Sequence, residues 1–310
     1  MTRRWSLTLL VVAALTGIIA LGIGAGRFVL ARSTFVAAAQ STEDSVEPDD
    51  ATSTDEADGA DDVAALDART ALPGRQVALT AALAAYEVTD QAEFALAVVD
   101  HRTGLSYTFH GDQAFATASV VKVDILAALL LRAQDAGRGL TATERDLADT
   151  MIRNSDNDAA STLWEMIGGA DGLAAADERL GLTETVPGPD GWWGMTTTTV
   201  TDRIKLLDTI DDPNGPLAPS REYVLDLMSR VAADQAWGAS AGAGPEETVA
   251  LKNGWVDDDT GTWIINTTGR ITGPDTDLTI AVLSDHQTGY AAGVTAVEQI
   301  VALVRSTLAS

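Results

Sequence analysis

A nearly continuous apolar segment with a lysine in its first turn limits how this chain can fold. The segment is ATASVVKVDILAALLL, residues 116–131, and its lysine is Lys122. Apolar residues on all sides predict a helix buried inside the protein over residues 119–136, so other elements must surround it. Burying an ammonium group without a partner costs free energy, and we therefore expect Lys122 to serve a chemical purpose.

Composition excludes several kinds of site. The chain has no cysteine, which rules out disulfides, thiolate nucleophiles and iron–sulfur clusters. Its three histidines are His101, His110 and His286, so a multi-histidine metal site is not expected, and neither is a cofactor. The formal net charge of −25 argues against a partner bound through a phosphate backbone, so no nucleic acid is expected.

The N-terminal segment has the pattern of a membrane anchor. Trp5–Gly26 is a run without a charged residue, which as a helix would span about 33 Å and cross a bilayer. We expect residues 1–32 to be a single-pass anchor that keeps the large domain outside the cytoplasm. Small residues in FVAAAQ (35–40) leave open a signal segment that is cleaved to release a secreted protein.

An acidic segment follows the apolar one. Residues 41–68 contain eleven acidic residues, no basic ones and almost no large hydrophobic ones. Such a composition predicts a disordered spacer, which we place at residues 33–74, and a single folded domain at residues 75–310.

The folded part has strand-like patterns near both ends and helical patterns between them. A helix is predicted at 75–88 and a closing helix at about 291–308, and the segments to about residue 236 are mostly helical. Strands are predicted at 94–100, 105–110, 248–256, 262–272 and 277–285. This order predicts an α+β fold, in which both ends of the domain build one antiparallel sheet flanked by helices and an all-helical lobe is inserted.

Ser119 and Lys122 are spaced to act together. Residues three apart on a helix lie one turn apart on the same face. Burial lowers the pKa of an amine, and a neutral lysine beside a hydroxyl is a general base beside a nucleophile. The backbone N–H of Ser119, at the helix start, is a candidate oxyanion donor. The alternative is a lysine that reaches the surface from the helix start.

Two further motifs carry polar groups suited to the same chemistry. In Ser155-Asp156-Asn157, Ser155 is a candidate proton shuttle and Asn157 a substrate contact, although the triplet also suits a helix N-cap. In Lys252-Asn253-Gly254, the glycine would let another backbone approach a strand, and the N–H of Trp255 is a second oxyanion candidate. The alternative for Lys252 is a solvent-facing lysine on an edge strand.

Together the motifs carry a family resemblance. Ser-x-x-Lys, Ser-Asp-Asn and a Lys-x-Gly triplet, in this order, resemble the signature of class A β-lactamases and penicillin-binding proteins, from about residue 75 to the C-terminus. The resemblance implies a β-lactamase/transpeptidase-like fold, a serine hydrolase mechanism through an acyl-enzyme, and a β-lactam or cell-wall peptide-like substrate. It implies Ser119 as nucleophile, Lys122 as base, Ser155 as proton shuttle, and substrate contacts from Asn157, Lys252, Asn253, Gly254 and Trp255. We expect a monomer.

The sequence departs from that family at two places that bear on turnover. Residue 253 is Asn where the family usually has Thr or Ser. The loop LGLTETVPGPDGWWGM (180–195) lacks the Glu-x-x-Leu-Asn pattern whose glutamate activates the deacylating water, and Glu184 and Asp190 are the candidates to replace it. Trp192 and Trp193 in this loop could wall the cleft or simply pack the loop, and we favour packing.

Other functions remain open on the sequence alone. They are a penicillin-binding D,D-peptidase-like enzyme or an esterase with slow deacylation, and a non-catalytic binding module on the same fold. GASAG (238–242) also matches the nucleophile elbow of α/β-hydrolases around Ser240, but that motif needs a strand before it and a helix after it.

Overall fold

A five-stranded antiparallel sheet is the centre of the protein. The computed structural model describes residues 71–87, 93–189, 191–258 and 260–309. Within these ranges the sheet has the order β2-β1-β7-β6-β5. Its strands are β1 (Glu93–Asp100), β2 (Leu105–Phe109), β5 (Thr248–Asp257), β6 (Trp263–Gly273) and β7 (Thr276–Asp285). A second, two-stranded sheet pairs β3 (Phe115–Ala116) with β4 (Thr197–Thr198).

Helices make up most of the chain between β2 and β5. They are α2 (Lys122–Asp135), α3 (Ala142–Arg153), α4 (Asn157–Ile167), α5 (Gly169–Leu180), α6 (Val200–Asp211) and α7 (Arg221–Ser229). Short 3-10 turns join them: η1 (Ala118–Val121), η2 (Trp193–Met195), η3 (Ala218–Ser220) and η4 (Ala233–Gln235). The chain ends in α8 (Tyr290–Ala309).

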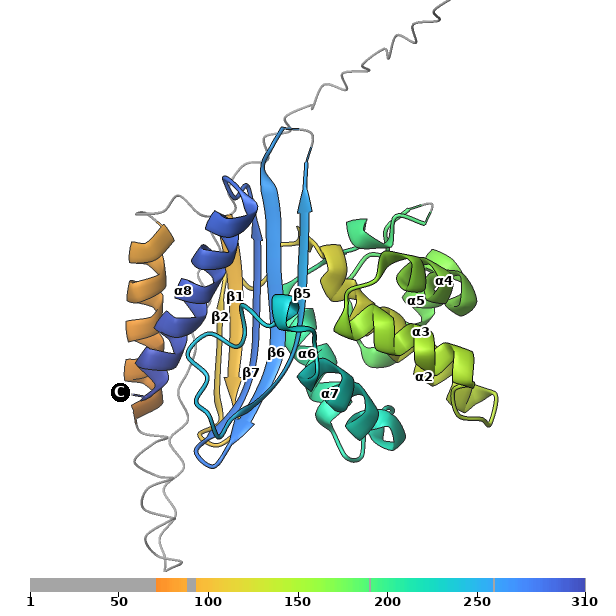
Figure 1. Ribbon diagram of the computed structural model, residues 1–310. Helices are drawn as coiled ribbons and strands as arrows, with labels where there is room; N and C mark the ends of the chain where they lie inside the picture. The colour runs from red at the N-terminus through yellow and green to blue at the C-terminus, as the bar shows by residue number, and fades with distance from the viewer. Residues whose placement is uncertain (1–70, 88–92, 190, 259, 310) are drawn as a thin grey trace, which may run out of the picture. The chain divides into compact units, whose positions relative to one another are not determined.

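The sheet separates two groups of helices (Figure 1). On one face lie α8 and the helix at residues 71–87, and on the other lie α6, α7 and the lobe of α2 to α5. Alternation along β1 explains both contacts, because Phe94, Leu96 and Val98 belong to the cluster with α8 while Ala95 and Ala97 belong to the cluster with α6. The small alanine side chains let α6 pack close to the sheet.

The predicted fold class is confirmed. All five predicted strands are present, and the first two and last three pair as one antiparallel sheet around the helical segment. The buried helix predicted at 119–136 is a 3-10 turn, η1, followed by α2, with eleven of α2's fourteen residues buried. The strands β3 and β4 were not predicted, since two residues are too few to show alternation.

The predicted boundary between linker and domain is misplaced. Residues 71–74, which we assigned to the linker, are helical, and Leu72 packs against the cluster between the sheet and α8. The anchor at 1–32 and most of the linker lie outside the described residues. Among the described residues, one helix is long and apolar enough to cross a membrane, and it is α8, which buries Val297, Ile300 and Val304 in the domain.

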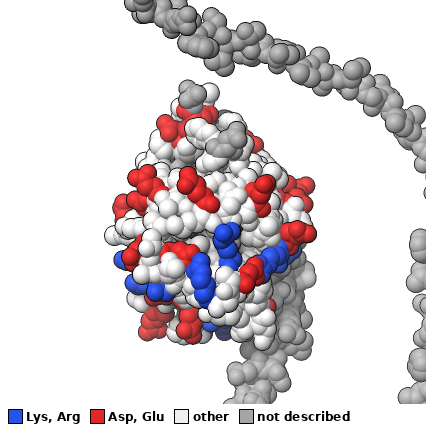
Figure 2. Space-filling view, turned by 90° about the vertical axis from the view of Figure 1, so that its right-hand side faces the viewer, with Lys and Arg blue, Asp and Glu red and all other residues white. Residues whose placement is uncertain are grey.

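The outer face of the helical lobe is charged. Figure 2 looks onto this side and shows acidic side chains around it, with Lys and Arg gathered in its lower half. Ion pairs tie the lobe together, as where Arg179 of α5 meets Asp135 at the end of α2 at 2.7 Å. Between α6 and the lobe, Arg203 of α6 and Asp124 of α2 form a pair at 2.5 Å that is almost completely buried.

Candidate active site

Ser119 and Lys122 lie where the helical lobe meets the edge of the sheet. Ser119 belongs to η1 and is half-buried, while Lys122 opens α2 and is completely buried. The turn η1 contacts both β5 and η2. Ser119 is therefore held between a strand on one side and the loop at residues 193–195 on the other.

Gly254 makes the close contact between β5 and η1 possible. A Cβ atom at this position would lie 2.6 Å from the Thr117 carbonyl oxygen and 2.7 Å from the Ser119 backbone nitrogen. Atoms cannot approach so closely, so only glycine allows the strand to lie directly against the backbone of Ser119. This is the close backbone approach expected from a glycine within a strand.

Asn266 holds the same segment from the neighbouring strand. It lies opposite Gly254 in the β5–β6 register and is fully buried. Its side-chain amide donates to the carbonyls of Ala116 and Thr117 at 2.9 and 3.1 Å, and its Oδ1 accepts from the backbone N–H of Ser284. Sequence analysis missed this residue, because a lone asparagine in a strand gives no signal of what lies across it.

Ser155 has a left-handed backbone conformation that turns two of its oxygens toward Lys122. Its φ is 57°, which is unfavourable for a residue with a side chain. Lys122 Nζ donates to the Ser155 carbonyl at 2.6 Å and to its Oγ at 3.2 Å. The strain at this position is therefore associated with a polar contact at the candidate site.

The Ser155-Asp156-Asn157 triplet is both a helix cap and part of the site. Asp156 caps α4 by accepting from the backbone N–H of Ala159 at 2.7 Å. The first residue of that helix, Asn157, accepts from Lys122 Nζ through Oδ1 at 2.8 Å. The capping interpretation and the functional one thus apply to different residues of the same triplet.

Lys252 reaches the same serine from the sheet. Although β5 is an edge strand, Lys252 is buried, and its Nζ donates to Ser155 Oγ at 3.0 Å and to the Asn253 carbonyl at 2.8 Å. The Ser155 hydroxyl thus lies between two amines. The interpretation of Lys252 as a solvent-facing lysine is wrong.

Burial makes both amines weaker bases than usual. Removal from water lowers the pKa of Lys122 to about 7, against the opposing effect of the Asp156 charge. Removal from water also lowers the pKa of Lys252 well below its usual value, and the neighbouring charge of Lys122 adds to this. A substantial fraction of Lys122 is therefore neutral, and able to accept a proton, near pH 7.

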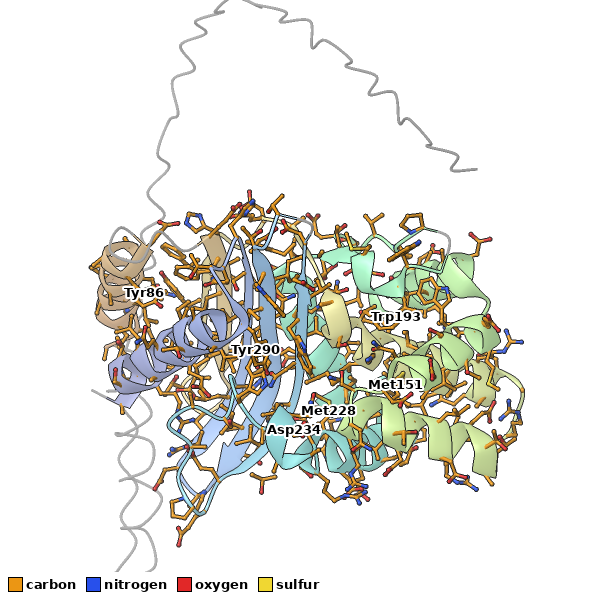
Figure 3. All side chains as sticks on the ribbon, turned by 45° about the horizontal axis from the view of Figure 1, so that its top comes forward. Tyr86, Met151, Trp193, Met228, Asp234 and Tyr290 are labelled. Atoms are coloured by element: carbon orange, nitrogen blue, oxygen red, sulfur yellow. The ribbon has the colours of Figure 1, made fainter. Side chains whose placement is uncertain are left out.

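A cavity of about 310 Å³ opens in front of Ser119. It is lined by Ala118, Ser119, Asn157, Gly191, Trp192, Trp193, Gly194, Met195, Trp255 and Val256. Two of these tryptophans come from the loop that we expected to pack on itself, and Figure 3 shows Trp193 on the helical-lobe side of the site. Trp193 also packs against the core of the lobe, whereas Trp192 is 69% exposed.

Asn253 does not have the substrate-binding position expected of it. Its side chain is buried, with Nδ2 donating to the carbonyls of Gln235 and Trp237 and Oδ1 accepting from Thr267. These side-chain hydrogen bonds go to a loop and to the next strand, and Asn253 is not among the residues that line the cavity. Asn253 ties residues 235–237 to the sheet.

Of the two candidate deacylation bases, the structure describes only Glu184, which does not line the cavity at Ser119. Glu184 lines a separate hollow together with Asp202 and Lys205, so its prediction as a base is wrong. Asp190 lies outside the described residues. No carboxylate occurs among the described residues that line the cavity at Ser119.

The sequence match of GASAG to a nucleophile elbow can be compared with its place in the structure. Among the described residues there is also no group of three or more His, Asp or Glu side chains arranged to hold a metal ion. Ser240 lies in a turn between a 3-10 helix and a loop, not between a strand and a helix, and its Oγ donates to the Ala236 carbonyl. The α/β-hydrolase interpretation of GASAG is therefore wrong.

Known proteins resemble this chain in sequence. A family model described as the β-lactamase enzyme family matches residues 132–308, a range that includes Ser155 and Lys252 and begins after Ser119 and Lys122. Proteins named "Putative lipoprotein LppW" from Mycobacterium tuberculosis and Mycobacterium bovis are 32% identical over 191 residues, 59% of this chain. The matched region spans about 60% of the length of those relatives.

Solved structures resemble it in fold. A class A β-lactamase from Bacteroides cellulosilyticus superimposes with a TM-score of 0.66 at 17% identity, covering 76% of this chain and 98% of that one. The TLA-3 extended-spectrum β-lactamase gives a TM-score of 0.68 at 16% identity, covering 76% of this chain and all of the other. At such identities the likeness is one of fold.

Proposed function

This chain belongs to the β-lactamase enzyme family, and from that premise we propose that it is a serine hydrolase acylated at Ser119 by a β-lactam or a related amide. The observation that carries the proposal is the convergence of two buried lysines on one hydroxyl beside a half-buried serine. Lys122 and Lys252 both donate to Ser155 Oγ, at 3.2 and 3.0 Å. Burying two amines costs folding free energy. A role in proton transfer explains why both are buried at one site.

The proposed acylation follows from the neutral form of Lys122. Lys122 Nζ takes the proton of Ser119 as the serine oxygen forms a bond to the substrate carbonyl carbon. The amide C–N bond then breaks, and the leaving nitrogen receives a proton through Ser155 Oγ, which is in contact with both amines. The backbone N–H groups of Ser119 and Trp255 are the proposed oxyanion donors.

The two sides of the cavity have separate proposed roles. Asn157, on the lobe side, lines the cavity and contacts Lys122, which suits a residue that holds a substrate amide. On the sheet side Lys252 donates to Ser155 Oγ, and Gly254 brings β5 against Ser119. No cofactor or metal enters the proposed reaction.

A D,D-peptidase-like enzyme with slow deacylation is the second candidate. It is favoured by the lining of the cavity, in which the described residues include no carboxylate to activate a water. Such an enzyme would be acylated in the same way and would differ in the fate of the ester. A non-catalytic binding module on the same fold is a weaker candidate, because both lysines contact Ser155. An esterase on the same fold is a further alternative.

We also propose an extracytoplasmic location at the cell membrane. It rests on the uncharged Trp5–Gly26 segment and on the similarity to the proteins named "Putative lipoprotein LppW". The protein would act as a monomer there, anchored by one N-terminal helix. Cleavage of that segment would instead give a secreted form.

The proposal is tested by mass spectrometry of the intact full-length protein mixed with benzylpenicillin. We expect a mass increase equal to one penicillin molecule, and no increase in a Ser119→Ala variant. Ser240→Ala is a matched control, since its hydroxyl lies outside the cavity, and this variant should be acylated like the wild type.

The time course separates the two candidates. An adduct that disappears as penicillin is consumed supports a β-lactamase, and one that persists supports the peptidase-like enzyme. A wild-type adduct that also forms in Ser119→Ala would contradict the assignment of the nucleophile.

A further inference from the structure

Lys122 Nζ is buried beneath contacts with three other residues. It donates to the Ser155 carbonyl, to Ser155 Oγ and to Asn157 Oδ1. Above it lies the ring of Trp193, with the ring centroid 4.8 Å from Nζ. The side chain has no solvent-exposed surface. The ring therefore covers the amine on the side of η2.

Trp193 is fixed in this position by contacts on two elements. Its indole Nε1 donates to Ser161 Oγ of α4 at 3.2 Å, and its ring packs against the apolar core of the lobe. The next residue, Gly194, accepts at its carbonyl from Thr117 Oγ1 at 3.4 Å, which joins the loop to the segment that carries Ser119. The ring is therefore held in place by packing and hydrogen bonding, unlike a mobile side chain at the surface.

The position of the ring bears on the second half of the reaction. To hydrolyse an acyl-enzyme, a water oxygen must bond to the ester carbon, the bond from that carbon to Ser119 Oγ must break, and the proton of the water must return to Ser119 Oγ through a base. Lys122, the base proposed above for acylation, is the group that we take to accept this proton. A water must then lie beside Nζ, where the ring of Trp193 stands.

We propose that Trp193 keeps water from Lys122 and so prolongs the life of the acyl-enzyme. This inference rests on the proposed function, and it adds that the lifetime is set by one side chain. Acylation needs no space beside the ring, because the proton of Ser119 passes directly to the amine. Deacylation does need space for a water beside Nζ. The ring therefore slows deacylation and leaves acylation unaffected.

The experiment measures the formation and the decay of the adduct separately, with the full-length protein in detergent and a fluorescent penicillin. After labelling, excess unlabelled benzylpenicillin is added and the bound fluorescence is followed on denaturing gels. We expect a stable adduct in the wild type and, in Trp193→Ala, decay faster by about tenfold or more, because water then reaches the base.

Three variants control for other effects of the substitution. Trp193→Phe keeps a ring above the amine but loses the hydrogen bond to Ser161, so it should shorten the lifetime only in part, and it remains informative if Trp193→Ala fails to fold. Ser161→Ala removes the hydrogen bond that fixes the indole and should shorten the lifetime in part. Trp192→Ala enlarges the same cavity but leaves the ring above Lys122, so it should accelerate the decay much less than Trp193→Ala does.

The outcomes distinguish this inference from the proposed function. Absence of any Ser119-dependent adduct overturns both. An adduct that forms in the wild type and decays as fast as in Trp193→Ala overturns the inference alone. Equal acceleration in Trp192→Ala and Trp193→Ala would also overturn it, by showing that cavity size and not coverage of the amine controls hydrolysis.

Discussion

At the scale of single residues, the site depends on the protonation of one amine. Lys122 has a pKa of about 7 because burial disfavours its charged form. Its three hydrogen bonds hold it toward Ser155 and Asn157 in the structure, and none of the described contacts of Nζ is to Ser119. Contact with Ser119 would be made as the hydroxyl loses its proton, since such bonds often tighten only when substrate is bound.

We expect Lys122→Met to slow acylation by about 10² to 10⁴-fold, because it removes the general base and retains a side chain of similar length. In the wild type the acylation rate should rise as pH increases through 7 and level off above it, since the neutral amine is the active form. Stopped-flow measurements with the fluorescent penicillin across this range test both statements.

Lys205→Met is the matched control for this substitution. Lys205 is exposed on α6 and contacts the Gly181 carbonyl, outside the cavity at Ser119. It should leave acylation and its pH dependence as in the wild type. A Lys122→Met variant with an unchanged rate would show that another base acts.

Residues of the candidate site that belong to short sequence motifs could be predicted. The orientation of side chains that depends on packing could not. Ser155, Asn157 and Lys252 follow from short motifs, and they meet in the structure. The role of Asn253 was misjudged because the sequence does not show which groups lie beside a strand residue. In the structure its side-chain amide bonds with Thr267 and with a loop. Trp193 was underestimated because its contact with Lys122 joins segments far apart in the sequence.

At the scale of elements, the position of Ser119 depends on how closely η1 lies against β5. Gly254 leaves the space for this contact, and Asn266 of β6 holds the segment before Ser119 through two backbone carbonyls. Strand, turn and helix start are thereby fixed to one another. Long segments with regular alternation showed the sheet in the sequence, but this junction is made of short pieces that carry no periodicity.

We expect Gly254→Ala to impair both acylation and stability. The added Cβ would lie 2.6 Å from the Thr117 carbonyl oxygen, 2.7 Å from Ser119 N and 2.8 Å from Val120 N, so strand and turn must separate. Overpacking of this kind costs about 1–3 kcal/mol. Urea unfolding and the rate of adduct formation measure the two effects.

Gly139→Ala is the appropriate control, because a Cβ there meets no atom within 4 Å. It should change neither the unfolding free energy nor the acylation rate appreciably. A Gly254→Ala variant as stable and as reactive as this control would contradict the role given to the glycine.

At the scale of the whole molecule, a cluster of buried ionisable side chains lies between α6 and two helices of the lobe. Arg203 of α6 pairs with Asp124 of α2, while Asp177 of α5 is buried nearby with no hydrogen-bond partner for either carboxylate oxygen within the described structure. Burial, together with the charge of Asp124, raises the pKa of Asp177 to about 8. Asp177 is therefore largely protonated in the folded protein at neutral pH.

This raised pKa predicts how the stability of the domain varies with pH. In the unfolded chain Asp177 ionises near pH 4, so between about pH 4 and pH 8 the folded state binds the extra proton. The contribution of Asp177 to the unfolding free energy therefore falls as pH rises through this interval. We expect the unfolding free energy of the wild type to fall over that interval more than that of Asp177→Asn, which cannot ionise.

Urea unfolding of both proteins at about pH 5 and about pH 8 tests this expectation. Glu184→Gln provides a comparison, because it removes an acidic residue of the same domain that is exposed. It should keep the wild-type dependence on pH. An equal fall in Asp177→Asn and in the wild type would contradict the assignment of this dependence to Asp177.

The pairing of β1 with β7 has a consequence for how the protein is made. These strands come from opposite ends of the domain, with Leu96 opposite Val282, and the entire helical lobe lies between them in the chain. During synthesis β1 is finished long before β7 exists, and one edge of β1 stays unpaired all that time. Unpaired strand edges are templates for other chains, so aggregation of nascent molecules is most probable in this interval.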